Sequence, residues 1–104
     1  MCIRDSVCGD LDRAFPPAPD FWVIDAAIAA QNMTLAANDL GIGSVWLGTW
    51  PDEKRVKRQA AIFQLPETIV PHSILALGYP AEDIDMRAVR PSRYEENRVH
   101  VNQW

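Results

Sequence analysis

The residues whose types and spacing most suggest a binding site are the glycines in the middle of the chain, within residues 40–48 (LGIGSVWLG). Glycine lacks a Cβ atom, so it lets the backbone come close to a flat ring or a phosphate. Gly41 and Gly43 have the spacing of a nucleotide-binding G-x-G, but Trp46 stands where that motif has its third glycine. These glycines also follow a predicted helix instead of a strand, so the run fails the dinucleotide fingerprint. The pattern alone favours a helix end followed by a buried strand.

A second group of candidate residues lies in the C-terminal tail, which is rich in arginine. Arg90 and Arg93 bracket Pro91-Ser92, and Arg87 and Arg98 lie nearby. A planar guanidinium can donate two parallel hydrogen bonds to a phosphate, so this pair could bind one. The alternative is that these arginines only solvate an exposed arm.

Other kinds of site have no support in the sequence. His72 lies at the start of a predicted strand and His100 in the tail, and neither has a nucleophile partner for a hydrolytic triad. Cys2 and Cys8 are not spaced as C-x-x-C, and no second cysteine or histidine pair completes a zinc site, so we expect no metal. The four tryptophans are expected to anchor a core or an interface.

Composition and charge narrow the class of protein. The chain has 104 residues, of which 48% are hydrophobic and 23% charged, as in an ordinary globular domain. Its formal net charge is −4 and it has no basic run, so we expect no nucleic-acid partner. No run reaches the roughly 18 apolar residues of a membrane span, and residues 1–6 lack the apolar stretch of a signal peptide. We therefore expect a cytoplasmic protein.

Hydrophobic periodicity predicts a long helix just before the glycine-rich run. We expect it over residues 21–40, with Asp20 as its N-cap and Gly41 as its C-terminal stop. The helix is apolar or small on nearly every face, which is typical of a helix buried on most sides. Its small face predicts close packing against another helix or a second subunit. That face consists of Val23, Ala30, Thr34 and Ala37.

Two strands, a second helix and an arm are predicted after it. Residues 44–49 form a short extended segment, and residues 53–63 form a charged helix opened by Pro51-Asp52. Residues 69–78 read as a strand buried on both faces. Residues 81–104 are polar and read as an extended arm, so the pattern as a whole is α/β or α+β. The inward face of the second helix is predicted to be Val56, Ala60 and Phe63.

From residue 21 to residue 80 the sequence resembles the nitroreductase family almost throughout. The order and spacing of short matching pieces carry this resemblance. The pieces are Asp25-Ala26-Ala27, Gln31-Asn32, Leu35-Ala36-Ala37, residues 40–46, Leu65-Pro66 and Leu77-Gly78-Tyr79-Pro80. The tail also resembles the end of one branch of that family, through Arg90-Pro91-Ser92-Arg93-Tyr94, Arg98-Val99-His100 and Trp104.

The resemblance implies a fold, an assembly and an activity. The implied fold is α+β and nitroreductase-like, with central strands flanked by a long buried helix and followed by an extended C-terminal arm. It implies a homodimer with FMN in a cleft at the subunit interface, and the small faces of the long helix and the aromatic arm predict that these two elements join the subunits. The implied activity passes electrons from NAD(P)H through FMN to an electron-poor acceptor such as a nitroaromatic or a quinone. Because the flavin carries out this chemistry, no catalytic side chain is expected.

The resemblance also implies which residues lie beside the flavin. Trp46, Leu47, Gly48 and Thr49 would run along the isoalloxazine ring, with the backbone N–H of Gly48 directed at flavin N5. A backbone donor suits this place because it needs no ionisation and little reorganisation. Many relatives have Pro-x-Glu-Gly here, so the role of that acidic side chain is absent from this chain and only the backbone role carries over.

The tail arginines match the basic pair that holds the flavin phosphate in the family. Ser92-Arg93 aligns with the Lys-Ser-Arg of many relatives, and Arg90 takes the place of the other basic residue. The resemblance therefore implies that Arg90 and Arg93 bind the phosphate of FMN.

Two other functions stay open, and the extent of the domain is a separate expectation. The chain could be a non-catalytic α/β interaction module, or a flavin-fragmenting or dehalogenating member of the same family. Residues 1–6 are expected to be a non-native or disordered lead-in, because they carry opposite charges where a buried strand needs apolar residues. Residues 7–104 would be the C-terminal part of a single domain. The family's N-terminal Arg-Ser-x-Arg-like segment has no match here, so we expect this portion alone to be inactive.

Overall fold

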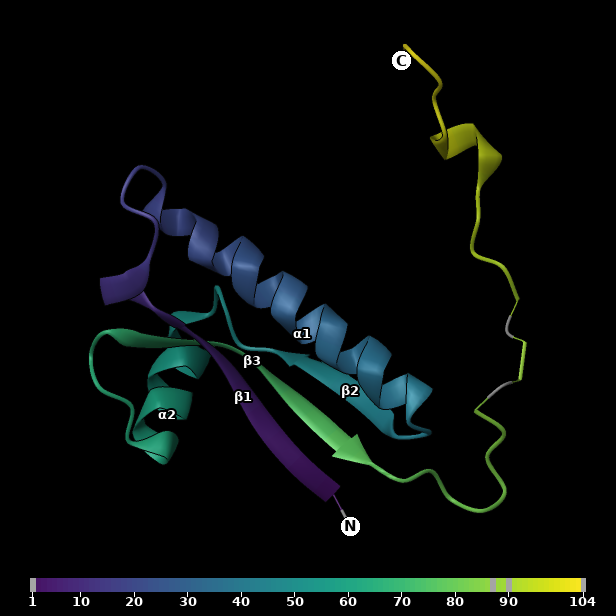
Figure 1. The fold of residues 1–104 in the computed structure, drawn as a ribbon, viewed down its shortest axis with the longest axis horizontal. Helices are drawn as coiled ribbons and strands as arrows, with labels where there is room; N and C mark the ends of the chain where they lie inside the picture. Colours follow the sequence, from purple (N-terminus) through teal and green to yellow (C-terminus); the bar gives the residue numbers. More distant parts are fainter. Residues whose placement is uncertain (1, 87, 90, 104) are drawn as a thin grey trace.

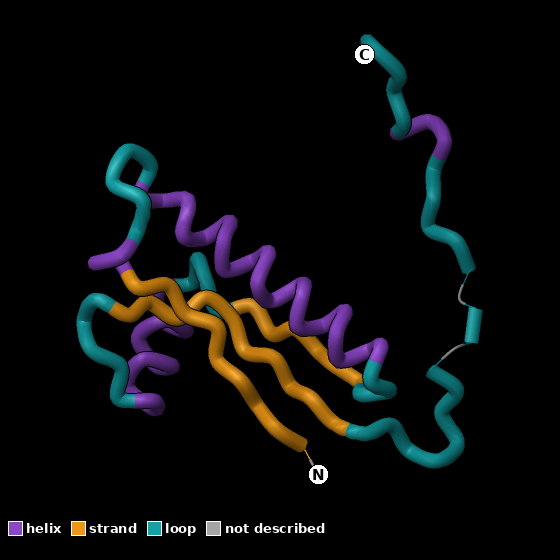
Figure 2. Tube along the Cα trace, in the orientation of Figure 1, coloured by secondary structure: helices purple, strands orange, loops and turns teal. Residues whose placement is uncertain are grey.

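The fold is a three-stranded antiparallel sheet with one helix on each face and a long arm (Figure 1). The computed structural model describes residues 2–86, 88–89 and 91–103. The sheet has the order β1-β3-β2, so the last strand in the sequence lies in the centre. The helix α1 runs along one face, and α2 packs near one end of the other face (Figure 1, Figure 2).

The central strand is β3, Ile69–Gly78, and it pairs with both of its neighbours. Its residue Leu75 is completely buried, as expected for an apolar run between two strands. The edge strand β2 covers Gly43–Gly48. The predicted strand over residues 69–78 is confirmed, and the extended segment predicted over residues 44–49 is confirmed with a shift of one residue.

The other edge strand, β1, includes residues that were expected to be a lead-in. It covers Cys2–Asp10, and Arg4 and Asp5 pair with Ala76 and Leu75 of β3. The expectation of a disordered lead-in is therefore wrong for residues 3–6. The reason is that β1 is an edge strand whose Arg4 and Asp5 are exposed, so it does not need the apolar residues of a buried strand. That residues 1–6 are non-native, and that residues 7–104 are the C-terminal part of a single domain, stay predictions.

The long helix α1, Trp22–Asp39, starts differently from the prediction and stops as predicted. Asp20 is not its N-cap: it lies in a 3₁₀ turn, Pro19–Phe21, and Phe21 takes the cap position without a side-chain hydrogen bond. At the other end Gly41 has a φ of 71°, a left-handed conformation that glycine adopts without strain. The N–H groups of Gly41 and Ile42 donate back to the last turn, so this C-terminal stop is confirmed.

The faces of α1 are used in the opposite way to the prediction. Ala26, Ala30 and Ala37 are buried, and they pack against the sheet of the same chain instead of another helix or subunit. Alanine at these positions lets the helix backbone approach the sheet closely. The larger apolar residues Ile28 and Leu35 are 55% and 59% exposed. In this chain α1 therefore leaves an apolar face open, and it is not buried on most sides.

The second helix, α2, covers Glu53–Phe63 as predicted. It ends at Gln64, which has a left-handed φ of 52°. Val56 and Ala60 are half-buried, whereas Phe63 is 45% exposed and lines a cavity between α2 and the sheet, so it lies on the inward face without being buried. The buried side chain of this helix is Gln59.

After Gly78 the chain leaves the sheet as an extended arm (Figure 1). Its described part contains one short 3₁₀ turn, Glu96–Arg98, so the predicted arm is confirmed. Within the described part of the chain, no helix is long and apolar enough to cross a membrane.

Candidate functional site

The four residues predicted to lie beside a flavin are at the end of β2 and just beyond it. Trp46, Leu47 and Gly48 end the strand, and Thr49 follows it. Trp46 and Leu47 are 37% and 47% exposed, whereas Thr49 is 5% exposed. Successive side chains of a strand alternate between faces, so Trp46 and Leu47 lie on opposite sides of the sheet.

The turn after β2 is fixed by its own backbone. The N–H groups of Thr49 and Trp50 both donate to the carbonyl oxygen of His72, at 3.2 and 3.0 Å. The N–H of Asp52 donates to the carbonyl oxygen of Thr49 at 3.1 Å. The end of β2 is therefore held on the central strand by hydrogen bonds that do not depend on side chains.

The backbone N–H of Gly48 points to the free edge of the sheet. Hydrogen-bonded and non-bonded pairs alternate along an antiparallel ladder. Because Thr49 donates to His72, its neighbour Gly48, which lies opposite Ser73, occupies a non-bonded position. The strand β2 is the outer strand on this side, and a Cβ atom at Gly48 would meet nothing within 4 Å. A flat ligand can therefore reach this backbone donor.

The first turn of α2 is attached to the same strand end. Nη1 of Arg55 donates to the carbonyl oxygen of Gly48 at 3.1 Å, and its Nε lies 3.3 Å from Oδ2 of Asp52. The other carboxylate oxygen of Asp52 accepts from the N–H groups of Lys54 and Arg55, at 2.9 and 3.2 Å, and so caps the helix. This geometry places a guanidinium beside Gly48.

A buried network of hydrogen bonds holds the Thr49 side chain in place. The Thr49 hydroxyl donates to Oε1 of Gln59, which is 5% exposed, and Nε2 of Gln59 donates to Oγ of Ser6 at 2.7 Å. Oγ of Ser6 lies 3.2 Å from Sγ of Cys8. Burying an amide is unfavourable unless its donor and acceptor are both satisfied, and here both are. The network therefore joins β1, α2 and the turn after Gly48.

Sequence reasoning missed both Arg55 and Gln59. Gln59 lies between Val56 and Ala60, the two half-buried apolar residues of α2. A polar residue within a predicted apolar face was the signal that could have found it. Arg55 gave no comparable signal, because an exposed arginine in a charged helix is ordinary.

An aromatic cluster lies beside the turn. The ring of Trp22 packs edge-on against Trp50 and His72, with centroid distances of 5.2 and 6.1 Å. Trp46 packs edge-on against His72 at 5.9 Å. Burial lowers the pKa of His72 below its ordinary value of 6.5, and Nδ1 of His72 lies 3.2 Å from Oγ of Ser73. Trp22 is half-buried and anchors this packing, whereas Trp46 and Trp50 are 37% and 40% exposed, and Trp104 lies outside the described residues.

A β-bulge explains how His72 joins this cluster. Val7 pairs with Ser73 and Cys8 pairs with Pro71, so His72 is an extra residue in the central strand. A bulge changes the direction of the side chain that it carries. It places the His72 ring on the α1 side, where Trp22 lies.

The predicted phosphate ligands lie apart from this turn. Arg90 falls outside the described residues. Arg93 is exposed on the arm, which starts at Gly78 opposite Gly43. Gly43 and Gly48 are the two ends of β2, roughly 17 Å apart at the usual rise of a strand, and the arm extends away from the sheet beyond the Gly43 end (Figure 1). One chain alone does not bring Arg93 beside Gly48.

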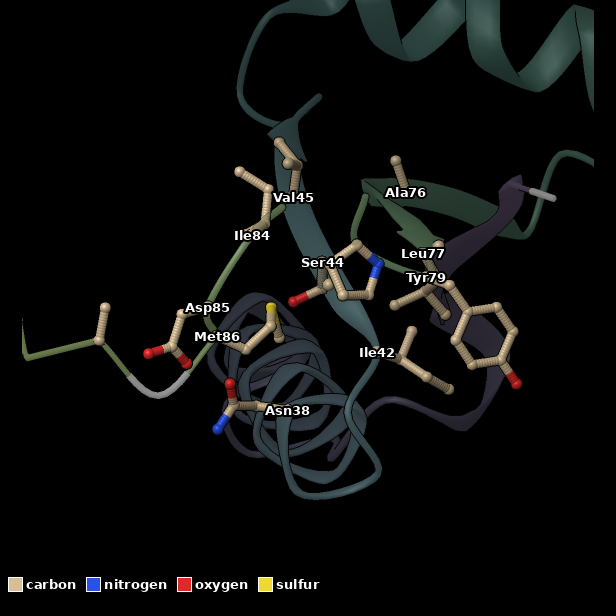
Figure 3. Close-up of a pocket in the computed structure, with 14 residues that line it drawn as sticks. Asn38, Ile42, Ser44, Val45, Ala76, Leu77, Tyr79, Ile84, Asp85 and Met86 are labelled. Atoms are coloured by element: carbon tan, nitrogen blue, oxygen red, sulfur yellow. The ribbon is translucent and has the colours of Figure 1, made fainter. Parts of the chain in front are cut away.

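Two cavities differ in their relation to the candidate site. A cavity of about 370 Å³ lies beside Gly48, between β2 and α2. A larger one of about 910 Å³ lies at the other end of β2, where Ile84–Met86 of the arm face Ser44 and Val45 (Figure 3). Of the predicted flavin-binding residues that the structure describes, none lines the larger cavity. Among the described residues, no group of three or more His, Cys, Asp or Glu side chains could hold a metal ion.

The sequence matches one family over most of its length. The profile of the nitroreductase family matches residues 6–79. A Methanothermobacter thermautotrophicus protein, provisionally named NADH dehydrogenase/NAD(P)H nitroreductase, is 41% identical over 93 residues, which cover 89% of this chain and 47% of that protein. The chain spans about half the length of the curated relatives it matches.

Solved structures support the same assignment. A Clostridium acetobutylicum protein, provisionally named NADH oxidase, superposes with a TM-score of 0.85 at 31% identity, over 97% of this chain and 58% of that one. A Bacteroides fragilis nitroreductase with bound FMN superposes with a TM-score of 0.56 at 30% identity, over 80% of this chain and 44% of that one. The predicted α+β, nitroreductase-like fold is confirmed. The chain belongs to the nitroreductase family.

Proposed function

We propose that the protein carrying this chain is an FMN-dependent oxidoreductase that passes electrons from NAD(P)H to an electron-poor acceptor, such as a nitroaromatic or a quinone. The observation that carries the proposal is the backbone N–H of Gly48, which lies at the free edge of the sheet in a non-bonded position. The names of the relatives, which include NAD(P)H nitroreductase and a nitroreductase with bound FMN, support the same activity.

The residues around Gly48 fit a flavin ring. Open space beside the Gly48 backbone leaves room for a flat ligand, and the N–H is a donor that needs no ionisation. Thr49 and Arg55 hold the two sides of this backbone in place, so the donor does not have to reorganise when a ligand arrives. Bound FMN would supply the two-electron chemistry between NAD(P)H and the acceptor.

The net reaction balances without a catalytic side chain. With a quinone, NAD(P)H and one proton from solvent yield NAD(P)⁺ and the hydroquinone. With a nitroaromatic, the same donor and proton yield NAD(P)⁺, the nitroso compound and water. The residues of this chain then serve to bind, to orient and to exclude water, and Gly48 and Thr49 are the parts of the chain nearest the reaction.

A homodimer would explain two features that a single chain leaves open. The apolar face of α1, with Ile24, Ile28 and Leu35, is more than half exposed, which is unusual for a face of this kind in a monomer. The arm cannot bring Arg93 to its own Gly48, but a second subunit could place it there. We therefore propose that α1 and the arm form the dimer interface. Sedimentation of the whole protein tests this, and a stable monomer at micromolar concentration would contradict it.

Spectroscopy of the purified whole protein tests the proposed activity. The protein should be yellow or become so with added FMN, and NADH or NADPH should bleach the flavin absorbance under anaerobic conditions. A quinone added afterwards should restore the absorbance. A colourless protein that binds no added FMN would overturn the proposal.

A further inference from the structure

The cavity beside Gly48 has the size and walls of a small-molecule site. Its volume of about 370 Å³ lies within the range of roughly 300–1,000 Å³ that ligand pockets occupy. Four apolar side chains form its walls: Leu47, Ile62, Phe63 and Ile74. Gly48 and Thr49 also line it, so the cavity lies next to the residue that carries the backbone donor.

One face of α2 carries arginines that line this largely apolar cavity. Arg55, Arg58 and Ile62 recur at spacings of three and four residues, so they lie on one side of the helix and all line the cavity. Arg4 of β1 lines it as well. No aspartate or glutamate lines the cavity, although the chain has 14 acidic residues and only 10 basic ones.

The arginines that line the cavity differ in whether they already have an acidic partner. Arg55 is held by Asp52 and by the Gly48 carbonyl. Among the described residues, neither Arg58 nor Arg4 takes part in an ion pair. A guanidinium with unused donors beside an apolar wall favours a planar oxyanion such as a carboxylate.

We propose that this cavity, the arginine subsite (Arg58 and Arg55 with Leu47, Ile62 and Phe63), binds the carboxylate of an aromatic electron acceptor. The ring of the acceptor would pack on the apolar wall, and its carboxylate would pair with Arg58. The subsite opens beside Gly48, so a ligand held there has its other end at the proposed flavin edge. This inference rests on the proposed function and narrows its acceptor to aromatic carboxylates.

A matched pair of acceptors tests the subsite in the whole protein loaded with FMN. 4-Nitrobenzoate and 4-nitrobenzamide have nearly the same shape and differ in charge. We expect the oxidised protein to bind the benzoate about tenfold more tightly in calorimetry, as for one partly exposed charge-assisted contact. The ratio of the two kcat/KM values should favour the benzoate by a similar factor.

Substitutions on α2 assign the preference to one side chain. Arg58→Gln should bring both ratios close to one, and Arg58→Lys should keep part of the preference because it keeps the charge. Lys57→Gln is the control, since Lys57 pairs with Glu53 at 3.7 Å and does not line the cavity. It removes the same charge from the same helix and should leave both ratios as they are.

Three results would overturn the inference. They are a wild-type ratio near one, an equal fall of the ratio in Arg58→Gln and Lys57→Gln, and a loss of bound FMN in Arg58→Gln, which would assign Arg58 to the flavin. Failure of the proposed function looks different, because the protein would then bind no FMN and reduce neither acceptor. In that case calorimetry with the two ligands still decides whether the arginine subsite prefers the carboxylate.

Discussion

The two ends of β2 are held in very different ways. At the Gly48 end, the His72 carbonyl, Gln59 and Arg55 all bond to the turn, and the aromatic cluster packs beside it. At the Gly43 end, the partner strand β3 leaves the sheet after Gly78 and runs into an arm whose described side chains are largely exposed, with Val89 at 99%. The Gly48 end is fixed by this chain alone, whereas the described part of the arm beside the Gly43 end is largely exposed.

This difference shows which parts of the proposed site one chain can build. The backbone donor at Gly48 is held in position before any ligand arrives, as a site for a flat cofactor requires. Arg93 has no such support among the described residues, so its role depends on a cofactor or a second subunit. Substitutions of the residues that pack or bond around the Gly48 end should therefore change stability, whereas substitutions in the arm should change binding alone.

The largest effect is expected in the arm, and only when flavin is present. Arg93→Ala in the whole protein should weaken FMN binding by about 10- to 150-fold, as for the loss of a charge-assisted phosphate contact. The free energy of unfolding without FMN should not change, because Arg93 is exposed. FMN titration and urea unfolding measure the two quantities.

Arg98→Ala is the matched control for this prediction. Arg98 lies in the same arm and is paired with Glu95 at 2.7 Å. Its replacement should affect FMN binding much less. Equal losses in the two variants would remove the assignment of Arg93 to the phosphate.

The next largest expected effect is a change of stability from packing near the Gly48 end of β2. A Cβ atom at Gly9 would collide with the indole of Trp22, whereas one at Gly48 would meet open space. Gly9→Ala should therefore lower the free energy of unfolding by about 1–3 kcal/mol, the usual range for overpacking. Gly48→Ala should change it by less than about 0.5 kcal/mol, as at an unconstrained surface position. Urea denaturation of both variants checks this, and similar losses would show that the fixed end is not packed as described.

A smaller loss is expected from the buried amide. Gln59→Leu removes the partner of the Thr49 hydroxyl and leaves that buried group unsatisfied, which costs about 1–2 kcal/mol. Gln64→Leu is the control, because Gln64 lies at the exposed end of the same helix. If Gln59→Leu is as stable as the wild type in urea, the network does not hold the turn.

The smallest effect is a pH dependence at His72. Burial lowers the pKa of His72 below 6.5, so protonation favours the unfolded chain. The contribution of His72 to stability is therefore complete above pH 6.5 and declines as the pH falls below that value. Urea midpoints at pH 7.5 and pH 5.5, for the wild type and for His72→Phe, measure it. The wild type should lose more stability than the variant on acidification, and the opposite order would refute the assignment.

Local sequence patterns predicted the elements well where short-range chemistry sets them. Asp52 caps α2, and Gly41 ends α1 through its left-handed conformation, so both boundaries were visible in the sequence. The apolar run of β3 was likewise enough to predict a buried strand there. Asp20 was misplaced because a 3₁₀ turn, which has no strong local signal, opens α1 instead.

The features that local sequence patterns could not predict depend on contacts between elements that lie far apart in the sequence. The charges of Arg4 and Asp5 argue against a buried strand, and only the strand order shows that β1 lies at an edge. Gln59 is an ordinary helical residue until Thr49 and Ser6 are brought to it from two other elements. The position of Gly48 came from the family resemblance, and the free direction of its N–H came from the strand order.

The central claim is that the N–H of Gly48 donates to bound FMN, and FMN titration of two variants of the whole protein tests it most directly. Gly48→Ala keeps the N–H, whereas Gly48→Pro removes it at an edge position where proline is tolerated. We predict that Gly48→Pro binds FMN about 2- to 12-fold more weakly than Gly48→Ala, as for one lost hydrogen bond, with little difference in the free energy of unfolding. Equal FMN affinities in the two variants, or weaker binding by Gly48→Ala, would contradict the claim.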